Sequence, residues 1–156
     1  NISALSNWNT TSLTKIESIF NQCYKLSDFS AIKNWNVSKV TTMRAAFGHC
    51  HAMPNFNAIS NWNVSSVTNT QNMFINCISI TNLNELRGWN VSNVTMMKSM
   101  FYGCTALSDA SGINNWDITA VGKANFKQMF TKCPSHPTFS KRSGTWNSSG
   151  TFTPTS

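Results

Sequence analysis

The chain has 156 residues, the size of one domain, and 40% of them are hydrophobic, enough to form a core. Only 11% are charged, yet Lys and Arg outnumber Asp and Glu by 12 to 5, giving a net charge of +7. No apolar stretch reaches the length of about 18 residues that a membrane-spanning helix needs. The basic residues are scattered without interleaved aromatic residues, which argues against a nucleic-acid-binding protein.

A 27-residue period organises most of the chain. Five tryptophans recur at this spacing, and the cysteines follow it until the last one, which comes two residues late. A fixed period of this size is typical of one structural unit stacked on copies of itself. We therefore predict a repeat array over residues 1–133. The periodic residues are Trp8, Trp35, Trp62, Trp89 and Trp116, with Cys23, Cys50, Cys77, Cys104 and Cys133.

The segment around each Trp predicts a short strand. Residues 34–38 read Asn-Trp-Asn-Val-Ser, and polar and apolar residues alternate there as in a half-buried strand. Trp35 and Val37 are expected to point inward and the polar residues outward. Stacked on its equivalents, this segment would form a narrow parallel sheet with strands ~4.8 Å apart.

The segment after each strand predicts a short helix. Val40, Met43 and Phe47 are spaced as on one helical face, and Thr41 is expected to cap the helix N-terminus. The predicted fold class is therefore α/β: a leucine-rich-repeat-like solenoid of five 27-residue coils, each with a short parallel strand and a short helix. The equivalent N-caps are Thr68 and Thr95.

Residues 134–156 break the pattern. Pro134 and Pro137 follow the last periodic cysteine, and the tail is rich in Ser, Thr and Gly. We expect an irregular C-terminal cap, which repeat arrays need at an exposed end, or a linker. Because the chain opens in mid-repeat and carries no signal peptide, it is also expected to be a piece of a larger protein.

The fourth repeat carries a family resemblance. Its residues follow the running signature W-[DN]-[TV]-S-x-V-T-x-M-x-x-M-F-x-x-C-x-x-L. The chain resembles the BspA-like leucine-rich-repeat surface proteins, the bacterial surface protein family with repeats of roughly 26 residues. The resemblance implies a secreted or cell-surface binding scaffold with diverse partners. The matching residues are Trp89, Asn90, Val91, Ser92, Val94, Thr95, Met97, Met100, Phe101, Cys104 and Leu107.

The carboxylates and cysteines favour neither catalysis nor metal binding. The five carboxylates lie in different repeats without a recurring pair, so no acid–base site is predicted and the chain is not expected to be an enzyme. One cysteine per repeat, without C-x-x-C spacing, predicts buried thiols rather than disulfides or a zinc site. His49 and His51 flank Cys50, which belongs to the inward column, so they should point elsewhere. We predict no metal and no cofactor.

The outward side of the predicted strands is the candidate binding face. It repeats almost unchanged from coil to coil, whereas an irregular protein partner would be expected to require variation. Two interpretations stay open: side-chain amide ladders that stiffen the sheet, or a flat periodic surface for a periodic ligand such as a polysaccharide or ice. The face consists of Asn34, Asn36, Ser38, Asn61, Asn63, Ser65, Asn90 and Ser92.

Many of these asparagines are also Asn-x-Ser/Thr sequons. In a eukaryotic secretory pathway they could carry glycans, whereas otherwise Asn-Val-Ser is simply strand sequence. The possible glycosylation sites are Asn9, Asn36, Asn63, Asn90, Asn93 and Asn147.

Together these patterns predict a non-enzymatic, extracellular or cell-surface recognition or adhesion module. Its partner would be a protein or carbohydrate surface, or a polymer, held by the strand face. The alternative is a structural repeat unit of a larger fibre, shell or stalk, with copies of itself as partners. Nucleic acid is not an expected partner.

Overall fold

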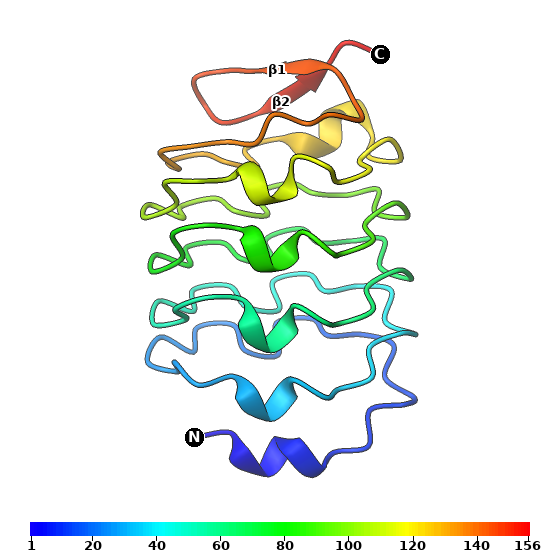
Figure 1. Cartoon of the computed structure of the whole chain (residues 1–156), viewed down its shortest axis with the longest axis vertical. Coiled ribbons are helices and arrows are strands. Elements are labelled where there is room, and N and C mark those ends of the chain that lie inside the picture. Colours follow the sequence, from blue (N-terminus) through cyan, green and yellow to red (C-terminus); the bar gives the residue numbers. More distant parts are fainter.

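The computed structural model describes residues 1–156 and shows a stack of coils (Figure 1). The chain winds around one long axis, and its two termini lie at opposite ends of that axis. Backbone hydrogen bonds join each coil to the next: the N–H of Ile16 donates to the carbonyl of Thr42, and the N–H of Thr41 to that of Thr14, each at 2.9 Å. The sequence period is therefore the distance along the chain between stacked residues.

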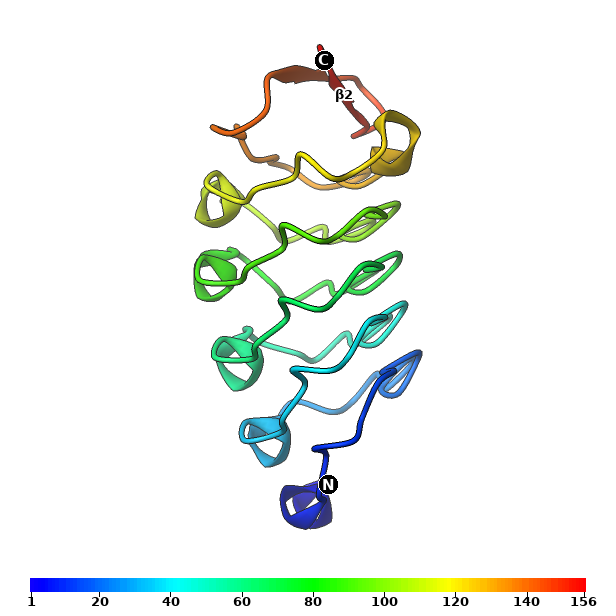
Figure 2. The same ribbon diagram turned by 90° about the vertical axis from the view of Figure 1, so that its right-hand side faces the viewer.

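Regular secondary structure is sparse. Each coil carries one short 3-10 helix on one side of the stack, and these five helices lie above one another (Figure 1), whereas a sixth, in the last coil, lies on the opposite side (Figure 2). No helix is long and apolar enough to span a membrane. The helices are η1 (Ser3–Asn7), η2 (Ser30–Ile32), η3 (Asn57–Ile59), η4 (Asn84–Leu86), η5 (Ser111–Ile113) and η6 (Lys123–Phe126), and the strands are β1 (Gly144–Trp146) and β2 (Phe152–Pro154).

The predicted fold class is wrong. The structure has no α-helix, and its only sheet is the antiparallel pair β1–β2. Residues 34–38 form no strand, and parallel pairing is limited to isolated bridges such as Lys15 with Thr42. Of 71 backbone hydrogen bonds, only 4 lie within helices or strands. The expected leucine-rich-repeat solenoid of strand-plus-helix coils is therefore not observed, and most of the chain is irregular.

The predicted helices are absent because alternate N–H groups leave the coil. Within residues 40–50, the N–H of Ala45 donates to the carbonyl of Gln71 in the next coil at 2.9 Å. Its neighbour Ala46 donates to Met43, three residues back, at 3.1 Å. An α-helix would direct every N–H to the residue four positions earlier. A row of tight turns replaces it, because half of the donors bind the neighbouring coil.

The predicted N-cap threonines have a different role. With no helix to cap, the hydroxyl of Thr68 donates to the carbonyl of Thr41 at 3.2 Å, and that of Thr95 to Thr68 at 3.3 Å. The hydroxyl of Thr41 reaches the carbonyl of Thr14 in the same way, at 3.4 Å. These threonines therefore join coils to one another.

The core consists of columns of equivalent side chains. The inward orientation expected for Trp35 and Val37 is confirmed, since both are buried. The rings of Trp35 and Trp62 are stacked at 6.4 Å and 3°, and the indole N–H of Trp62 donates to the carbonyl of Ile32 at 3.0 Å. Burial of these columns provides the main stabilisation. A parallel column of stacked rings comprises Phe20, Phe47, Phe74, Phe101 and Phe130.

Residues beyond the last coil cover the C-terminal end of the stack. Strands β1 and β2 form a hairpin there (Figure 1), and the ring of Trp146 packs edge-on against Phe130 at 5.2 Å. The N–H of Phe130 donates to the carbonyl of Gly150 at 2.9 Å. The Arg142 guanidinium donates to the carbonyl of Val121 at 2.6 Å. This end therefore has its apolar groups covered and its hydrogen-bonding groups paired.

Candidate binding face

The outward polar residues of the predicted strands lie on one side of the stack. The segments that follow η2, η3 and η4 form the right-hand side in Figure 1 and the side facing the viewer in Figure 2. The structure therefore brings together the residues predicted from the sequence. We call the set Asn34, Asn36, Ser38, Asn61, Asn63, Ser65, Asn90 and Ser92 the amide face.

The central asparagines of the amide face close local turns. The Oδ1 of Asn36 accepts hydrogen bonds from the backbone N–H of Ser38 at 3.0 Å and from its hydroxyl at 2.7 Å. Asn63 binds Ser65 in the same way, at 3.1 and 2.6 Å. Asn and Ser favour such side-chain-to-backbone bonds two residues along the chain. The third copy of the turn joins Asn90 and Ser92.

This geometry excludes the side-chain amide ladder. The Oδ1 atoms bind within their own coil, and the Nδ2 groups of Asn36, Asn63 and Asn90 donate to no protein atom. All three side chains are exposed. The face therefore presents three unpaired amide donors, held in one orientation by three identical turns. Of the two interpretations, the structural ladder is overturned, and a periodic ligand stays a prediction.

The same turn is built with Asp in the last coil. The Oδ1 of Asp117 accepts the backbone N–H of Thr119 at 3.1 Å and its hydroxyl at 2.6 Å. The hydrogen bonds from Thr119 lower the pKa of Asp117, and Lys141 adds to that effect. An acceptor oxygen is thus sufficient for the turn, and only Asn leaves an N–H₂ group facing outward.

A second asparagine column flanks the first. Asn34 and Asn61 are exposed and form no hydrogen bonds with the protein. The equivalent position in the next coil is Gly88, where an added Cβ would meet no atom within 4 Å. In the last coil the Oδ1 of Asn115 accepts the hydroxyl of Ser140 at 3.0 Å, so this asparagine is paired with the C-terminal segment. The column therefore has a gap at Gly88 that another side chain would fit.

The possible glycosylation sites fall into two groups. The Nδ2 of Asn93 is already engaged, since it donates to the carbonyl of Ser65 at 2.7 Å. The other sites form the local turn through Oδ1 and keep Nδ2 free, as Asn147 does with Ser149 at 3.0 and 2.8 Å. The sites of this second group are Asn9, Asn36, Asn63, Asn90 and Asn147.

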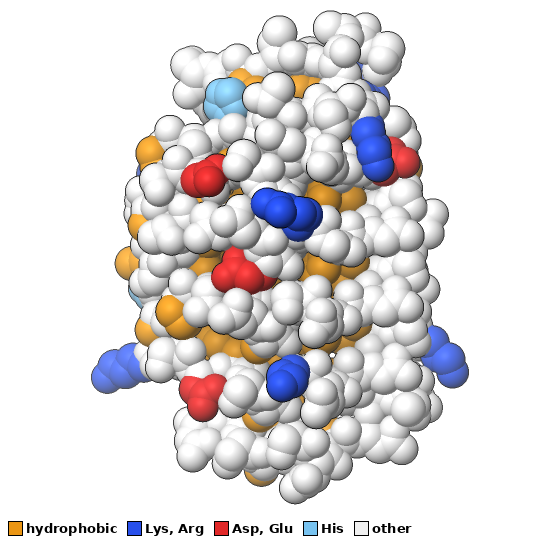
Figure 3. Space-filling model, in the orientation of Figure 1, with side chains coloured by type: hydrophobic (Ala, Val, Ile, Leu, Met, Phe, Trp, Pro, Cys, Tyr) orange, Lys and Arg blue, Asp and Glu red, His pale blue; other side chains and the backbone are white.

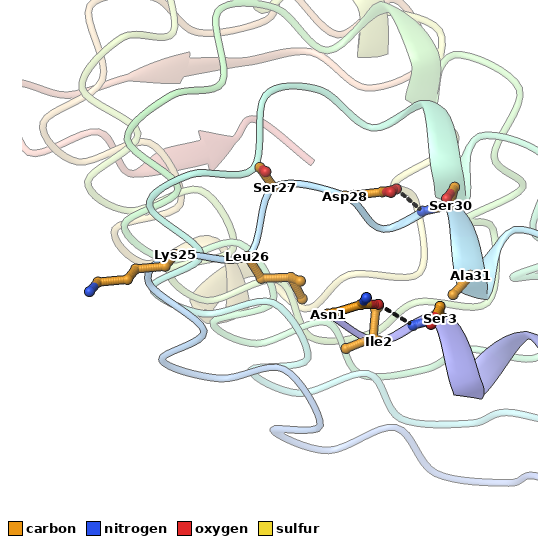
Figure 4. A pocket seen from close by; sticks show the side chains of 9 residues that line it. All are labelled: Asn1, Ile2, Ser3, Lys25, Leu26, Ser27, Asp28, Ser30 and Ala31. Atoms are coloured by element: carbon orange, nitrogen blue, oxygen red, sulfur yellow. Dashed lines mark hydrogen bonds between the residues drawn. The ribbon is translucent and has the colours of Figure 1, made fainter.

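Two neighbouring grooves on the side of the 3-10 helices were not predicted from the sequence. The first is a shallow cavity of about 480 Å³ between the N-terminal residues and the next coil (Figure 4). On its wall the Oδ1 of Asp28 accepts the N–H of Ser30 at 2.9 Å. The Ser30 side chain, together with that N–H, lowers the pKa of the Asp28 carboxyl. The signal was present in the sequence as an Asn or Asp two residues before the first residue of each of η1 to η5. These residues are Asn1, Asp28, Asn55, Asn82 and Asp109.

The groove lining offers little for catalysis. Lys25 and Asp28 are its only charged residues, and the other lining side chains are hydroxyl, amide or small apolar groups (Figure 4). Over this whole side of the molecule the charged side chains are few and separated (Figure 3). The groove therefore lacks the convergent, tuned acid and base that an active site requires.

The cysteines form a column inside the stack. The Sγ of Cys50 donates to the carbonyl of Phe20 at 3.3 Å, and burial raises its pKa to about 12. The interaction between the Cys104 and Cys133 side chains raises the pKa of the first thiol and lowers that of the second. All five thiols are free. Cys133, half-buried at the end of the column, therefore has the most thiolate character of this pair.

One known protein family matches almost the whole chain. The family model described as "Mycoplasma protein of unknown function, DUF285" matches residues 1–84 and 77–152. The chain belongs to this family. No match was found among curated proteins or among solved structures.

The histidines of this DUF285 chain pack with aromatic and amide groups. The Nδ1 of His49 lies 3.3 Å from the Nδ2 of Asn76, and the ring of His51 lies 4.8 Å from that of Tyr24. No three His, Cys, Asp or Glu side chains come together as metal ligands would.

Proposed function

We propose that the chain is a non-enzymatic recognition or adhesion module that acts outside the cell and binds a partner through the amide face. The observation that carries this proposal is the row of unpaired Nδ2 donors on Asn36, Asn63 and Asn90. Each donor is held by a closed turn, so little side-chain entropy is lost when a ligand binds.

The spacing of the donors favours a periodic partner. The rings of Trp35 and Trp62, beside the first two of these asparagines, are stacked at 6.4 Å, so the donors recur at a regular interval of that order. Asn9 extends the row by one coil, whereas Asp117 ends it because a carboxylate has no N–H₂ group. A neutral polymer with regularly placed hydroxyl, ether or carbonyl oxygens fits such a row, and a polysaccharide is the class that we favour.

The composition and the family resemblance support a position outside the cell. Asn, Ser and Thr carry the polar surface, and only 11% of residues are charged. The repeat sequence resembles that of BspA-like surface proteins, which implies a secreted or surface-bound scaffold. A protein exposed on a cell surface would meet polysaccharides and other proteins as partners.

A second candidate is a structural unit within a larger assembly. The observation that favours it is the open N-terminal end, where the Trp8 side chain is 57% exposed. In that case the partners would be further copies of the same type of coil. Such a role needs no specific ligand on the amide face.

A polysaccharide and glycan array at physiological salt tests the recognition proposal. The critical variant replaces Asn36, Asn63 and Asn90 with Asp, because Asp117 shows that an acidic residue preserves the turn. We expect the wild-type chain to bind at least one polysaccharide and the triple variant to lose that binding. An array without a hit, or a hit that the triple variant keeps, would count against the amide face.

The control variant changes the same chemistry on another side of the stack. Asn1, Asn55 and Asn82 also accept an N–H two residues ahead through Oδ1, beside the 3-10 helices. Replacing these three with Asp lowers the net charge from +7 to +4, as the test variant does. Binding should survive in the control, which separates loss of the amide donors from a change of charge.

A further inference from the structure

The second groove beside the 3-10 helices lies between the coils of η2 and η3, on the side that faces the viewer in Figure 3. Its volume is about 400 Å³, which falls within the roughly 300–1,000 Å³ of small-molecule sites. Both of its walls belong to internal coils of the stack. Its shape therefore depends on how these two coils pack and on which side chains they carry.

A proline helps to keep the two coils apart at this point. In the coil of η5, the N–H groups of Ser108 and Asp109 both donate to the carbonyl of Thr81 in the preceding coil, at 3.1 and 3.2 Å. The residue equivalent to Ser108 in the coil of η3 is Pro54, which has no N–H to donate. No backbone hydrogen bond joins Pro54 or Asn55 to the coil of η2. The backbones are therefore not drawn together here, and the groove stays open.

A small side chain, Ala58, also leaves room in the groove. The equivalent residue in the next coil is Glu85, which is half-buried, and no cavity lies between the coils of η3 and η4. In the coil of η5 the equivalent is Gly112, where an added Cβ would meet the carbonyl group of Leu83 at 2.6 Å. The coils of η4 and η5 are therefore too close for a groove. The second groove depends on residues of one pair of coils and does not follow from the repeat itself.

The lining of the second groove combines hydrogen-bond donors and acceptors without a net charge. Asp28 is its only carboxylate and Lys33 its only ammonium group. The Oδ1 of Asn55 accepts the N–H of Asn57 at 3.0 Å, which leaves the Nδ2 of Asn55 free. The side-chain amides of Asn57 and Asn61 form no hydrogen bond with the protein. The groove therefore offers one anionic acceptor, one cationic donor and several amide groups to a ligand.

These groups favour a neutral ligand that is rich in hydroxyl groups. Because the two charges cancel, the groove attracts neither cations nor anions strongly. A sugar hydroxyl both donates and accepts, so it can donate to the carboxylate of Asp28 and accept from the ammonium group of Lys33. The apolar side chains of Phe29, Pro54 and Ala58 can contact the C–H groups of a sugar ring. The lining is therefore complementary to a single neutral sugar.

We propose that the second groove binds one neutral sugar unit of the polysaccharide that lies on the amide face. Asn61 belongs to both the groove and the amide face, so a chain along that face can place one of its sugars in the groove. This inference rests on the proposed function and deepens it. The amide face repeats from coil to coil, whereas the groove occurs between one pair of internal coils, so the groove fixes the register of the polymer.

An NMR titration of the isotope-labelled full chain with free monosaccharides tests the groove without the amide face. The neutral probes are the methyl glycosides of glucose, galactose and mannose together with N-acetylglucosamine, and the charged probes are glucosamine and glucuronic acid. We expect at least one neutral sugar to shift the side-chain amide signals of Asn55, Asn57 and Asn61 in a saturable way. The Kd should lie in the millimolar range, because a monosaccharide has few atoms. No saturable shift with any neutral sugar, or tighter binding of a charged one, would overturn the proposal.

The critical variant, Ala58→Glu, fills the groove. It introduces the residue type that the next coil carries as Glu85, so the fold should be kept. The matched control is Ala31→Glu, which makes the same change at the equivalent position of the first groove. We expect Ala58→Glu to weaken binding of the neutral sugar by at least about tenfold, because the added side chain occupies the site. Equal affinities in the two variants would overturn the proposal.

A second pair of variants tests the carboxylate without filling the groove. Asp28→Asn keeps the local turn, since Asn55 forms the same turn in the next coil. It should weaken sugar binding by about tenfold, because a hydrogen bond to a carboxylate is stronger than one to an amide. Asp109→Asn makes the same change in the turn with Ser111, outside both grooves, and should have no effect. If the two variants bind the sugar equally well, the proposal is likewise overturned.

The groove and the amide face can fail separately. The variant with Asp in place of Asn36, Asn63 and Asn90 should still bind the monosaccharide, because none of these residues lines the groove. Polysaccharide binding on the array without monosaccharide binding would overturn the groove and leave the amide face supported. Monosaccharide binding that Ala58→Glu abolishes, together with an array without a hit, would support the sugar site and count only against the amide face.

Discussion

At the scale of single residues, the Asn-x-Ser turn gives the oxygen and the nitrogen of one side-chain amide different roles. The oxygen of Asn36 is fixed by Ser38 in its own coil, and the nitrogen is left free. Fixing one end of a short side chain orients the other without any contact to neighbouring coils. A repeat of this unit therefore produces a row of equivalent donors, and ladder bonds between side chains are not needed.

Removing the acceptor oxygen should destabilise the chain. Replacing Asn36, Asn63 and Asn90 with Ala removes the bonds to the serine hydroxyls and backbone N–H groups. We expect a loss of roughly 1–3 kcal/mol in the free energy of unfolding, measured in urea. The triple Asp variant keeps the oxygens and should lose less. Equal losses in the two variants would show that the turns contribute nothing to stability.

One glycine is required by both conformation and space. Gly150 has a φ of +70°, and a Cβ there would overlap the backbone of Phe130 and Thr131. Gly150→Ala should therefore lower the free energy of unfolding by roughly 1–3 kcal/mol. The matched control is Gly88→Ala, whose Cβ meets no atom within 4 Å and which should change stability by less than about 0.5 kcal/mol. Similar melting temperatures for the two variants would contradict this account.

At the scale of elements, the sequence predicts the period and the inward residues but not the backbone conformation. Apolar residues three or four apart, such as Val40, Met43 and Phe47, occur equally on a helix and on successive tight turns. The turns use left-handed residues, and these include Ala45 with a φ of 54° and His49 with a φ of 58°. Neither residue type signals that conformation, which L-residues other than Gly rarely adopt.

The candidate site was predicted more completely than the elements around it. Alternation alone placed Asn36 outward and Trp35 inward, whether or not a strand forms. What alternation does not encode is the hydrogen bond from Ser38 to Asn36, because that depends on the local turn. The grooves beside the 3-10 helices lie between coils, so no single repeat shows them.

The cysteine column gives a prediction about reactivity. Burial raises the pKa of Cys50 to about 12, whereas Cys133 is half-buried and the interaction with the Cys104 side chain lowers its pKa. Iodoacetamide should alkylate Cys133 in the folded chain even at a pH below about 8.5, which is the pKa of an ordinary thiol. Cys50 should react only after unfolding. Mass spectrometry that found both modified at equal rates would contradict the structure.

At the scale of the whole molecule, the stack is asymmetric. The C-terminal end is closed by a hairpin and by one guanidinium that reaches several carbonyls of the last coil. The Nη1 of Arg142 donates to Ile118 at 3.0 Å and to Val121 at 2.6 Å. Repeat arrays need an end of this kind, because each coil is stabilised only by its neighbours. The opposite end keeps its donors, acceptors and apolar rings exposed.

The stability of the closed end should therefore depend strongly on Arg142. Arg142→Ala removes charged hydrogen bonds to carbonyls of the last coil, and we expect a loss of roughly 1.5–3 kcal/mol in the free energy of unfolding. Lys141→Ala, next to it and exposed, is the control and should change stability little. Urea unfolding of the two variants measures the difference. An unchanged midpoint for Arg142→Ala would show that the guanidinium does not hold the cap.

The most direct test of the amide face is the substitution Gly88→Asn. Gly88 interrupts the outer asparagine column, and its Cβ position is open. On the polysaccharide array, measured beside the wild-type chain, Gly88→Asn should bind the same polysaccharide more tightly, because it adds a donor next to Asn90. If neither protein binds any polysaccharide, or if both bind with equal affinity, a periodic amide face is not how this chain recognises its partner.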